Sequence, residues 1–96
     1  MHLKTAVVQF TKFASKQTEK LPREIAEKLS IWKLTIELLG LREMRKTKGY
    51  HDEPLKGKRK GQRSSRLSRG YRVIYEEHEY KEIVIVGVQE INKHEY

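Results

Sequence analysis

The chain has 96 residues, the size of one compact domain, and carries 21 Lys and Arg against 13 Asp and Glu, a net charge of +8. It contains no cysteine, which excludes disulfide bonds, a thiolate nucleophile and a cysteine-ligated zinc site. The longest purely apolar run, residues 83–86, is far shorter than the roughly 20 residues of a membrane span. No apolar signal region opens the chain either, so we expect a soluble domain inside the cell with no membrane partner.

A strand and a short helix are predicted at the start of the chain. Apolar and polar residues alternate along residues 5–10, which is the pattern of a strand with one buried face. Helical spacing follows and ends near residues 21–22, and either Thr11 or Ser15 could cap this helix. Phe13 falls on its apolar face, and we expect it to pack in the core.

A second, longer helix is predicted from Pro22 to Gly40. Proline suits the first turn of a helix, and glycine is frequent just beyond the last turn. Apolar residues recur between them at steps of four and three, at Ile25, Leu29, Trp32, Ile36 and Leu39. The two helices therefore form an antiparallel pair with one apolar face.

The second half of the chain predicts a loop over residues 46–62 and then a meander of three strands. The strand patterns occupy residues 63–68, 71–76 and 82–90. Hairpin turns are expected at residues 69–70 and 77–80. The prediction is a single α+β domain over residues 1–96 with the order β-α-α-β-β-β, an antiparallel sheet with the helix pair packed on one side.

Positive charge is concentrated in one third of the chain. Residues 42–72 hold twelve basic and three acidic residues, a charge of +9, so the remainder sums to −1. The basic residues are Arg42, Arg45, Lys46, Lys48, Lys56, Lys58, Arg59, Lys60, Arg63, Arg66, Arg69 and Arg72. A polyanion is the natural partner of such a segment, and we favour a nucleic acid or an acidic protein over a merely solvated surface.

Several residues in and around this segment suit chemistry on a phosphodiester. A fixed Arg72 would stabilise the negative charge that develops on the phosphate oxygens. RNA supplies its own nucleophile, the 2′-hydroxyl, so the protein needs a base and an acid, and Glu53 and His94 are candidates. Tyr96 could stack on an unpaired base or position the phosphate. No metal ion or cofactor is required.

Which second arginine joins Arg72 depends on the hairpin turn. A two- or four-residue turn places Arg63 and Ser65 on the face of Arg72, whereas a three-residue turn places Arg66 and Ser64 there. Both arginines are candidate RNA contacts, and the remaining RNA-binding candidates are Lys58, Lys60, Arg69 and Tyr96.

The combination resembles the RelE/ParE superfamily of bacterial type II toxins, in particular its RelE, YoeB and HigB ribonuclease branches. The residues that carry the resemblance are the Glu53-Pro54-Leu55-Lys56-Gly57 stretch, Gly61, Arg72 in Tyr-Arg-Val-Ile-Tyr, and His94 near the C-terminus. The resemblance implies catalytic roles for Glu53, Lys56, Arg72 and His94. It also implies a bacterial cytoplasmic mRNA endoribonuclease that acts on the ribosome, leaves a 2′,3′-cyclic phosphate, and is silenced by a cognate antitoxin. Operator DNA would be contacted only through that antitoxin.

Two other functions use the same sequence features differently. A ParE-like toxin would keep the fold and inhibit DNA gyrase without chemistry. A non-toxic RNA-binding module would display aromatic residues among basic ones on the sheet, and Tyr71 and Tyr75 share one face of the predicted hairpin.

Overall fold

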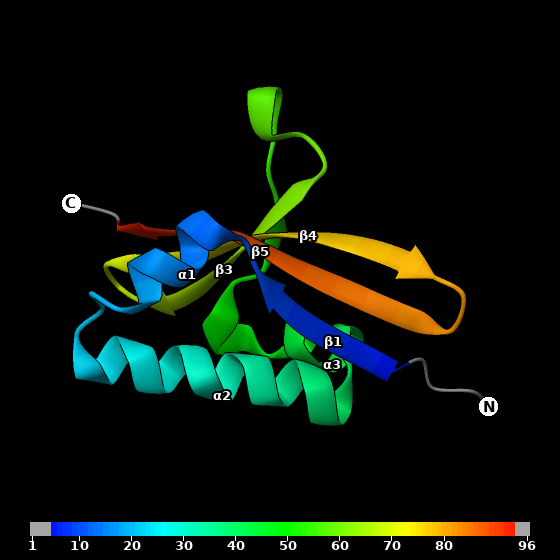
Figure 1. Cartoon of the computed structure of the whole chain (residues 1–96), viewed down its shortest axis with the longest axis horizontal. Coiled ribbons are helices and arrows are strands. Elements are labelled where there is room, and N and C mark those ends of the chain that lie inside the picture. Colours follow the sequence, from blue (N-terminus) through cyan, green and yellow to red (C-terminus); the bar gives the residue numbers. More distant parts are fainter. Residues whose placement is uncertain (1–4, 94–96) are drawn as a thin grey trace.

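The computed structural model describes residues 5–93 as one mixed sheet with helices on one face (Figure 1). The helices are α1 (Lys12–Thr18), α2 (Arg23–Leu39) and α3 (Leu41–Lys46), with short 3-10 turns η1 (Lys48–Tyr50) and η2 (Gly57–Arg59). The strands are β1 (Thr5–Phe10), β2 (Glu53–Pro54), β3 (Gln62–Ser68), β4 (Tyr71–Tyr80) and β5 (Ile83–Lys93). The predicted α+β class and the helix packing are confirmed.

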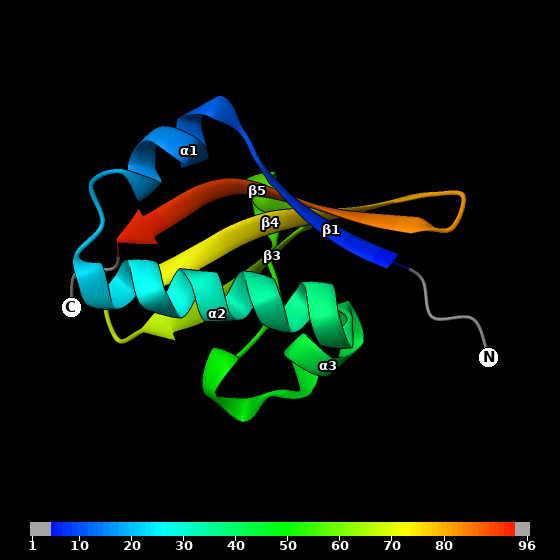
Figure 2. The same ribbon diagram turned by 60° about the horizontal axis from the view of Figure 1, so that its bottom comes forward.

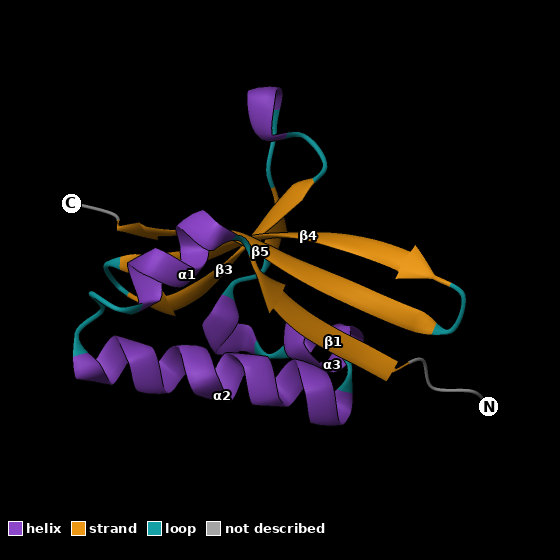
Figure 3. Ribbon diagram, in the orientation of Figure 1, coloured by secondary structure: helices purple, strands orange, loops and turns teal. Residues whose placement is uncertain are grey.

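The sheet order is β1-β5-β4-β3-β2, and the three long strands form the predicted antiparallel meander (Figure 3). β1 pairs with β5 in parallel, so the sheet is mixed and not wholly antiparallel as the sequence suggested. The direction follows from the path of the chain. α2 returns the chain to the end of the sheet where β1 began, and two hairpins then give β5 the direction of β1.

The start of α1 and both ends of α2 lie where the sequence indicates, whereas α1 ends at Thr18, earlier than the expected residues 21–22. Thr11 caps α1, because its hydroxyl accepts a hydrogen bond from the Ala14 amide at 3.1 Å. Gly40 ends α2 with φ +97°, a backbone conformation that side chains with a Cβ rarely adopt. Gln17 of α1 exchanges two hydrogen bonds with the backbone of Ile91, at 2.7 and 3.1 Å, and so fixes the end of β5. α2 lies across the sheet with α1 beside β5 (Figure 2).

The core lies between α2 and the inner face of the sheet. Trp32 is fully buried and meets the ring of Tyr75 edge-on, with 5.6 Å between ring centroids. Ile36 of the same helix is also fully buried. Two expected core residues are not there, since Phe13 is 61% exposed and Leu39 is 64% exposed. Ala14 is the buried residue of α1, and the buried stripe of α2 ends at Ile36, so neither side chain belongs to the buried face of its helix.

The segment expected to be a loop, residues 46–62, contains η1, β2 and η2 in succession, and the short helix α3, which was not predicted, precedes it. β2 was missed because it has only two residues, one of them proline, which is tolerated on an edge strand. The second hairpin turn was placed too early. Residues 77–80 continue β4, and the chain turns at Lys81 and Glu82, with Lys81 at φ +57°. Within residues 5–93 no helix is long and apolar enough to cross a membrane.

We predict that Trp32→Ala lowers the free energy of unfolding by about 3–5 kcal/mol, because it opens a cavity against Tyr75. Phe13→Ala should change it by less than about 0.5 kcal/mol, since that ring is mostly exposed. Urea denaturation of the two variants measures the difference. Equal losses would contradict this account of the core.

Candidate functional site

A pocket of about 250 Å³ lies on the face of the sheet that the helices leave open. Its floor comes from neighbouring strands, because Arg72 pairs with Asn92 across β4 and β5, and Ile74 pairs with Ser64 across β4 and β3. The segment of β2 and η2 rises from the sheet (Figure 1), and Glu53, Leu55 and Arg59 from this segment line one side of the pocket. The lining residues are Glu53, Leu55, Arg59, Ser64, Arg72, Ile74 and Asn92.

Arg72 is the central cation of this pocket. Its side chain is only 16% exposed. Nη1 donates a hydrogen bond of 2.8 Å to the hydroxyl of Ser64 and lies 3.7 Å from a carboxylate oxygen of Glu53. The Glu53 side chain is 58% exposed, so it can reach a bound ligand while Arg72 stays fixed in the floor. A guanidinium held in this way is preorganised to stabilise an anion.

A second arginine faces the pocket from the η2 loop. Arg59 lies 2.5 Å from one oxygen of Glu90 and donates a second hydrogen bond, of 2.9 Å, to Gln62. The other oxygen of Glu90 accepts a hydrogen bond of 2.9 Å from Asn92. Glu90 therefore connects the loop to the floor. Two guanidinium groups and the carboxylate of Glu53 line the pocket, and Glu90 binds one of the two arginines.

A buried carboxylate lies directly behind Glu53, on the helix side of the sheet. The side chain of Asp52 is 0% exposed. It accepts hydrogen bonds from Arg63 at 2.7 Å, Ser65 at 2.6 Å and the Tyr75 hydroxyl at 2.6 Å. Arg45 of α3 lies 3.7 Å away. Burial, followed by the hydrogen bond to Asp52, raises the pKa of Tyr75 well above its ordinary value, so the phenol stays protonated and donates.

The register settles the competition between the two arginines of β3. Arg66 lies opposite Arg72, which is the pairing that was expected for a three-residue turn. The cause is a shift of register between Arg66 and Ser68. Arg63 instead turns to Asp52. Neither lines the pocket, since Arg66 lies in a separate depression beside Tyr50 and Lys28.

The remaining predicted residues divide into three groups. Glu53 and Arg72 are brought together, as expected for a shared site. Four predicted residues are exposed and do not line the pocket, namely Lys56, which was expected to be catalytic, and the RNA-binding candidates Lys58, Lys60 and Arg69. His94 and Tyr96 lie outside the described residues, so their predicted roles remain predictions. Across the described part of the chain, no three His, Asp or Glu residues are placed to hold a metal ion.

The two tyrosines that the alternative RNA-binding module would use for stacking face the core. Tyr75 is 0% exposed and packs against Trp32, and Tyr71 is half-buried and packs against the same core. Their shared face turns toward the helices, which counts against an open aromatic platform on the sheet.

Sequence reasoning missed Arg59, Ser64 and Asn92 as parts of the pocket, and it missed Glu90 as the carboxylate that binds two of them. Alternation along the last strand does place Glu90 and Asn92 on one face, which is the signal that could have found them. Ser64 appeared only as one of two alternatives. Arg59 had no signal, because loop geometry alone brings it over the sheet.

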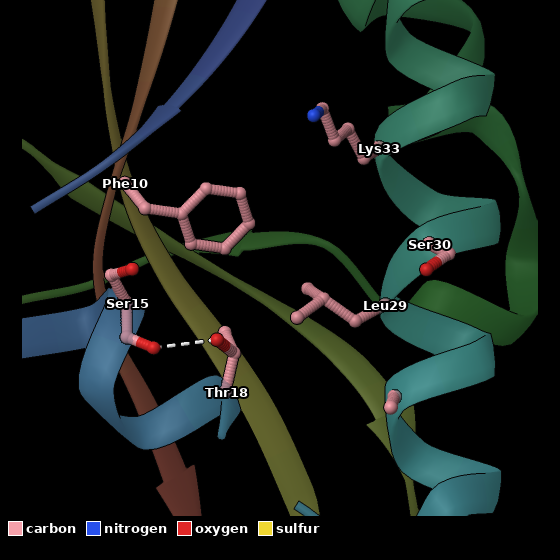
Figure 4. Close-up of a pocket in the computed structure, with 7 residues that line it drawn as sticks. Phe10, Ser15, Thr18, Leu29, Ser30 and Lys33 are labelled. Carbon is pink, nitrogen blue, oxygen red and sulfur yellow. Dashed lines mark hydrogen bonds between the residues drawn. The ribbon is translucent and has the colours of Figure 1, made fainter.

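A second depression, of about 270 Å³, lies between α1 and α2 (Figure 4). Phe10 and Leu29 form its apolar part, and the hydroxyl of Thr18 is bonded to the backbone of Ser15 at 2.6 Å. Among residues 5–93, Lys33 is the one charged residue of this lining, and none of the lining residues in that range carries a carboxylate or an imidazole. The described lining therefore offers no side chain of the usual kind for accepting a proton.

The fold matches solved toxin structures, although no protein-family model and no curated protein matches the sequence. A YoeB/ParE toxin from Agrobacterium tumefaciens has a TM-score of 0.67 at 19% identity, covering 93% of this chain and 99% of that chain. A chain of the archaeal RelE–RelB complex from Pyrococcus horikoshii gives 0.70 at 20%, covering 93% and 94%. A chain of the YoeB–YefM complex from Staphylococcus aureus gives 0.66 at 15%, covering 92% and 95%. The RelE/ParE-like fold expected from the sequence is therefore confirmed.

The exposed lysines beside the pocket generate a prediction about salt. Lys58→Ala and Lys60→Ala should each weaken binding of a short RNA oligonucleotide and lower the slope of log K against log salt by about 1, because each removes one phosphate contact. Lys20→Ala, a matched change in the exposed turn after α1, should leave the slope unchanged. Fluorescence anisotropy across a salt series measures all three. Equal slopes for every variant would show that the η2 loop does not contact RNA.

Proposed function

We propose that this protein is the toxin of a type II toxin–antitoxin pair and acts as a ribosome-dependent mRNA endoribonuclease. The observation that carries the proposal is the contact between Arg72 and Glu53 in the open pocket. A fixed cation and an exposed carboxylate on one small site are the two groups that 2′-hydroxyl attack on a phosphodiester needs first. The RelE/ParE-like fold supports the same proposal.

The chemistry follows from the positions of these groups. The scissile phosphate binds at Arg72, whose second donor role, toward Ser64, keeps the guanidinium in place. Glu53 accepts the proton of the 2′-hydroxyl as its oxygen attacks phosphorus. The bond from phosphorus to the 5′-oxygen breaks, and that oxygen takes a proton from an acid, which we propose is His94. The products are a 2′,3′-cyclic phosphate and a 5′-hydroxyl end.

Arg59 is a further candidate ligand of the phosphate. In the free pocket its charge is neutralised by Glu90 at 2.5 Å. A phosphate between Arg72 and Arg59 would compete with the two carboxylates for both guanidinium groups. The transition state carries more negative charge on the phosphate oxygens than the ground state, so this competition favours the transition state. Lys56, exposed beside the pocket, would add to the positive field.

The proposed partners are mRNA, the ribosome and a cognate antitoxin. Two of the structural neighbours above are complexes, RelE–RelB and YoeB–YefM, which supports a protein partner. The net charge of +9 in residues 42–72 suits both partners, since RNA and an acidic protein would cover the same cations. Operator DNA would be bound through the antitoxin, and the site of action would be the bacterial cytoplasm.

We predict that Arg72→Ala reduces cleavage of a defined message on programmed ribosomes by about 100- to 1,000-fold, because transition-state charge loses its main stabilising group. His94→Ala should also abolish the cuts. Primer extension on the message, with and without ribosomes, measures both. Arg23→Ala, on the 92%-exposed side chain of α2, is the control and should cut like the unmodified protein.

Circular dichroism and thermal melting of Arg72→Ala keep the test specific. A variant that is inactive and unfolded would show that Arg72 is structural, which would contradict its catalytic role. A protein that stops growth but cuts no RNA under any condition would contradict the ribonuclease proposal and favour inhibition of gyrase. A protein that leaves growth unaffected when expressed alone would contradict the toxin proposal.

A further inference from the structure

We propose that Asp52 is a positioning residue, whose buried carboxylate anchors the β2 segment and thereby holds Glu53 beside Arg72. This inference rests on the proposed function, because it gives a role to a side chain that the reaction itself does not touch. The contacts that position Glu53 then lie on the opposite face of the sheet from the pocket.

The burial of Asp52 is the first reason. A carboxylate with 0% exposure is costly to bury unless its charge is balanced and its oxygens are hydrogen-bonded. Both conditions are met here. Arg63 and Arg45 supply the positive charge, and Ser65 and Tyr75 donate the remaining hydrogen bonds at 2.6 Å.

The elements that these partners come from are the second reason. Arg63 and Ser65 belong to β3, Tyr75 to β4 and Arg45 to α3. Asp52, the residue directly before β2, therefore contacts two strands and one helix at once. Removing its carboxylate would also leave Arg63 with an unbalanced charge in a half-buried place, so the anchor is coupled to its surroundings.

The weakness of β2 is the third reason. Only two residues pair with β3, where Glu53 lies opposite Ser64 and Pro54 opposite Arg63. Proline has no amide hydrogen to donate, and one further backbone bond, from the Leu55 amide to Gln62 at 2.9 Å, continues the pairing. So short a strand does not fix an exposed glutamate by itself.

Alternation along the strand then converts the anchor into a position for Glu53. Successive side chains of an extended chain point to opposite faces. With Asp52 held among the residues of the inner face, Glu53 is directed to the outer face, where Arg72 lies 3.7 Å from it. A displacement of about 1 Å in such a group is enough to lower a rate about 100-fold.

The test is Asp52→Asn in the full-length protein, with two measurements. Hydrogen exchange should show that the Leu55 amide loses protection at least about tenfold more than the amides of β4 and β5. The kcat for RNA cleavage per folded molecule should fall about 10- to 100-fold with KM changed little, because binding by Arg72 and the lysines is retained.

Two further variants complete the design. Glu77→Gln is the matched control, since it removes the other carboxylate partner of Arg45 at 2.6 Å without touching Asp52, and it should change neither quantity. Tyr75→Phe keeps the ring against Trp32 and removes only the hydroxyl that donates to Asp52. It should produce the same two effects in weaker form even if Asp52→Asn fails to fold.

The outcomes separate this inference from the proposed function. Equal loss of protection throughout the sheet, or an unchanged kcat in folded Asp52→Asn and Tyr75→Phe from an active parent, would overturn the positioning role. Failure of the proposed function would look different, because the unmodified protein would then cut no RNA. In that case the selective exchange at Leu55 would still decide whether Asp52 anchors the strand.

Discussion

The buried carboxylate of Asp52 is the interaction on which the arrangement of the pocket depends. It joins β3, β4 and α3 to the residue that precedes β2, through hydrogen bonds of 2.6–2.7 Å and a nearby second arginine. Ion pairs and hydrogen bonds therefore stabilise the inner face of the sheet together with apolar packing. The same contacts position a residue on the outer face, because Asp52 is followed by Glu53, which lies 3.7 Å from Arg72.

Most of the fold could be predicted from the sequence because its long elements carry clear periodicity. The apolar spacing of α2 and the alternation of β3 and β4 depend on neighbours within one element, and the caps at Thr11 and Gly40 are local as well. What the sequence could not supply depends on contacts between distant segments. The parallel pairing of β1 with β5 and the two-residue β2 are set by the path of the whole chain.

The sequence predicts those residues of the candidate site whose side-chain type alone suggests a role in chemistry on a phosphodiester. Glu53 and Arg72 were predicted and do lie together. The sequence left Arg63 and Arg66 as alternatives, because it does not show that Arg63 binds Asp52, eleven residues before it. Arg59 and Glu90 are in contact although they are 31 residues apart in the sequence, and no local sequence pattern predicts this contact. The charge map had the same limit, since Arg45, Arg59 and Arg63 are neutralised within the fold while the η2 lysines stay exposed.

In the proposed reaction the 2′-hydroxyl of the RNA is the nucleophile, Glu53 accepts its proton, and Arg72 stabilises the negative charge that develops on the phosphate. The most direct test is to cut a message on programmed ribosomes, map the site, and repeat the reaction with a single 2′-deoxynucleotide placed on the 5′ side of the scissile phosphate. The account predicts a 2′,3′-cyclic phosphate from the ordinary message and no cut at the substituted position. Cleavage that persists at the deoxy position would contradict it.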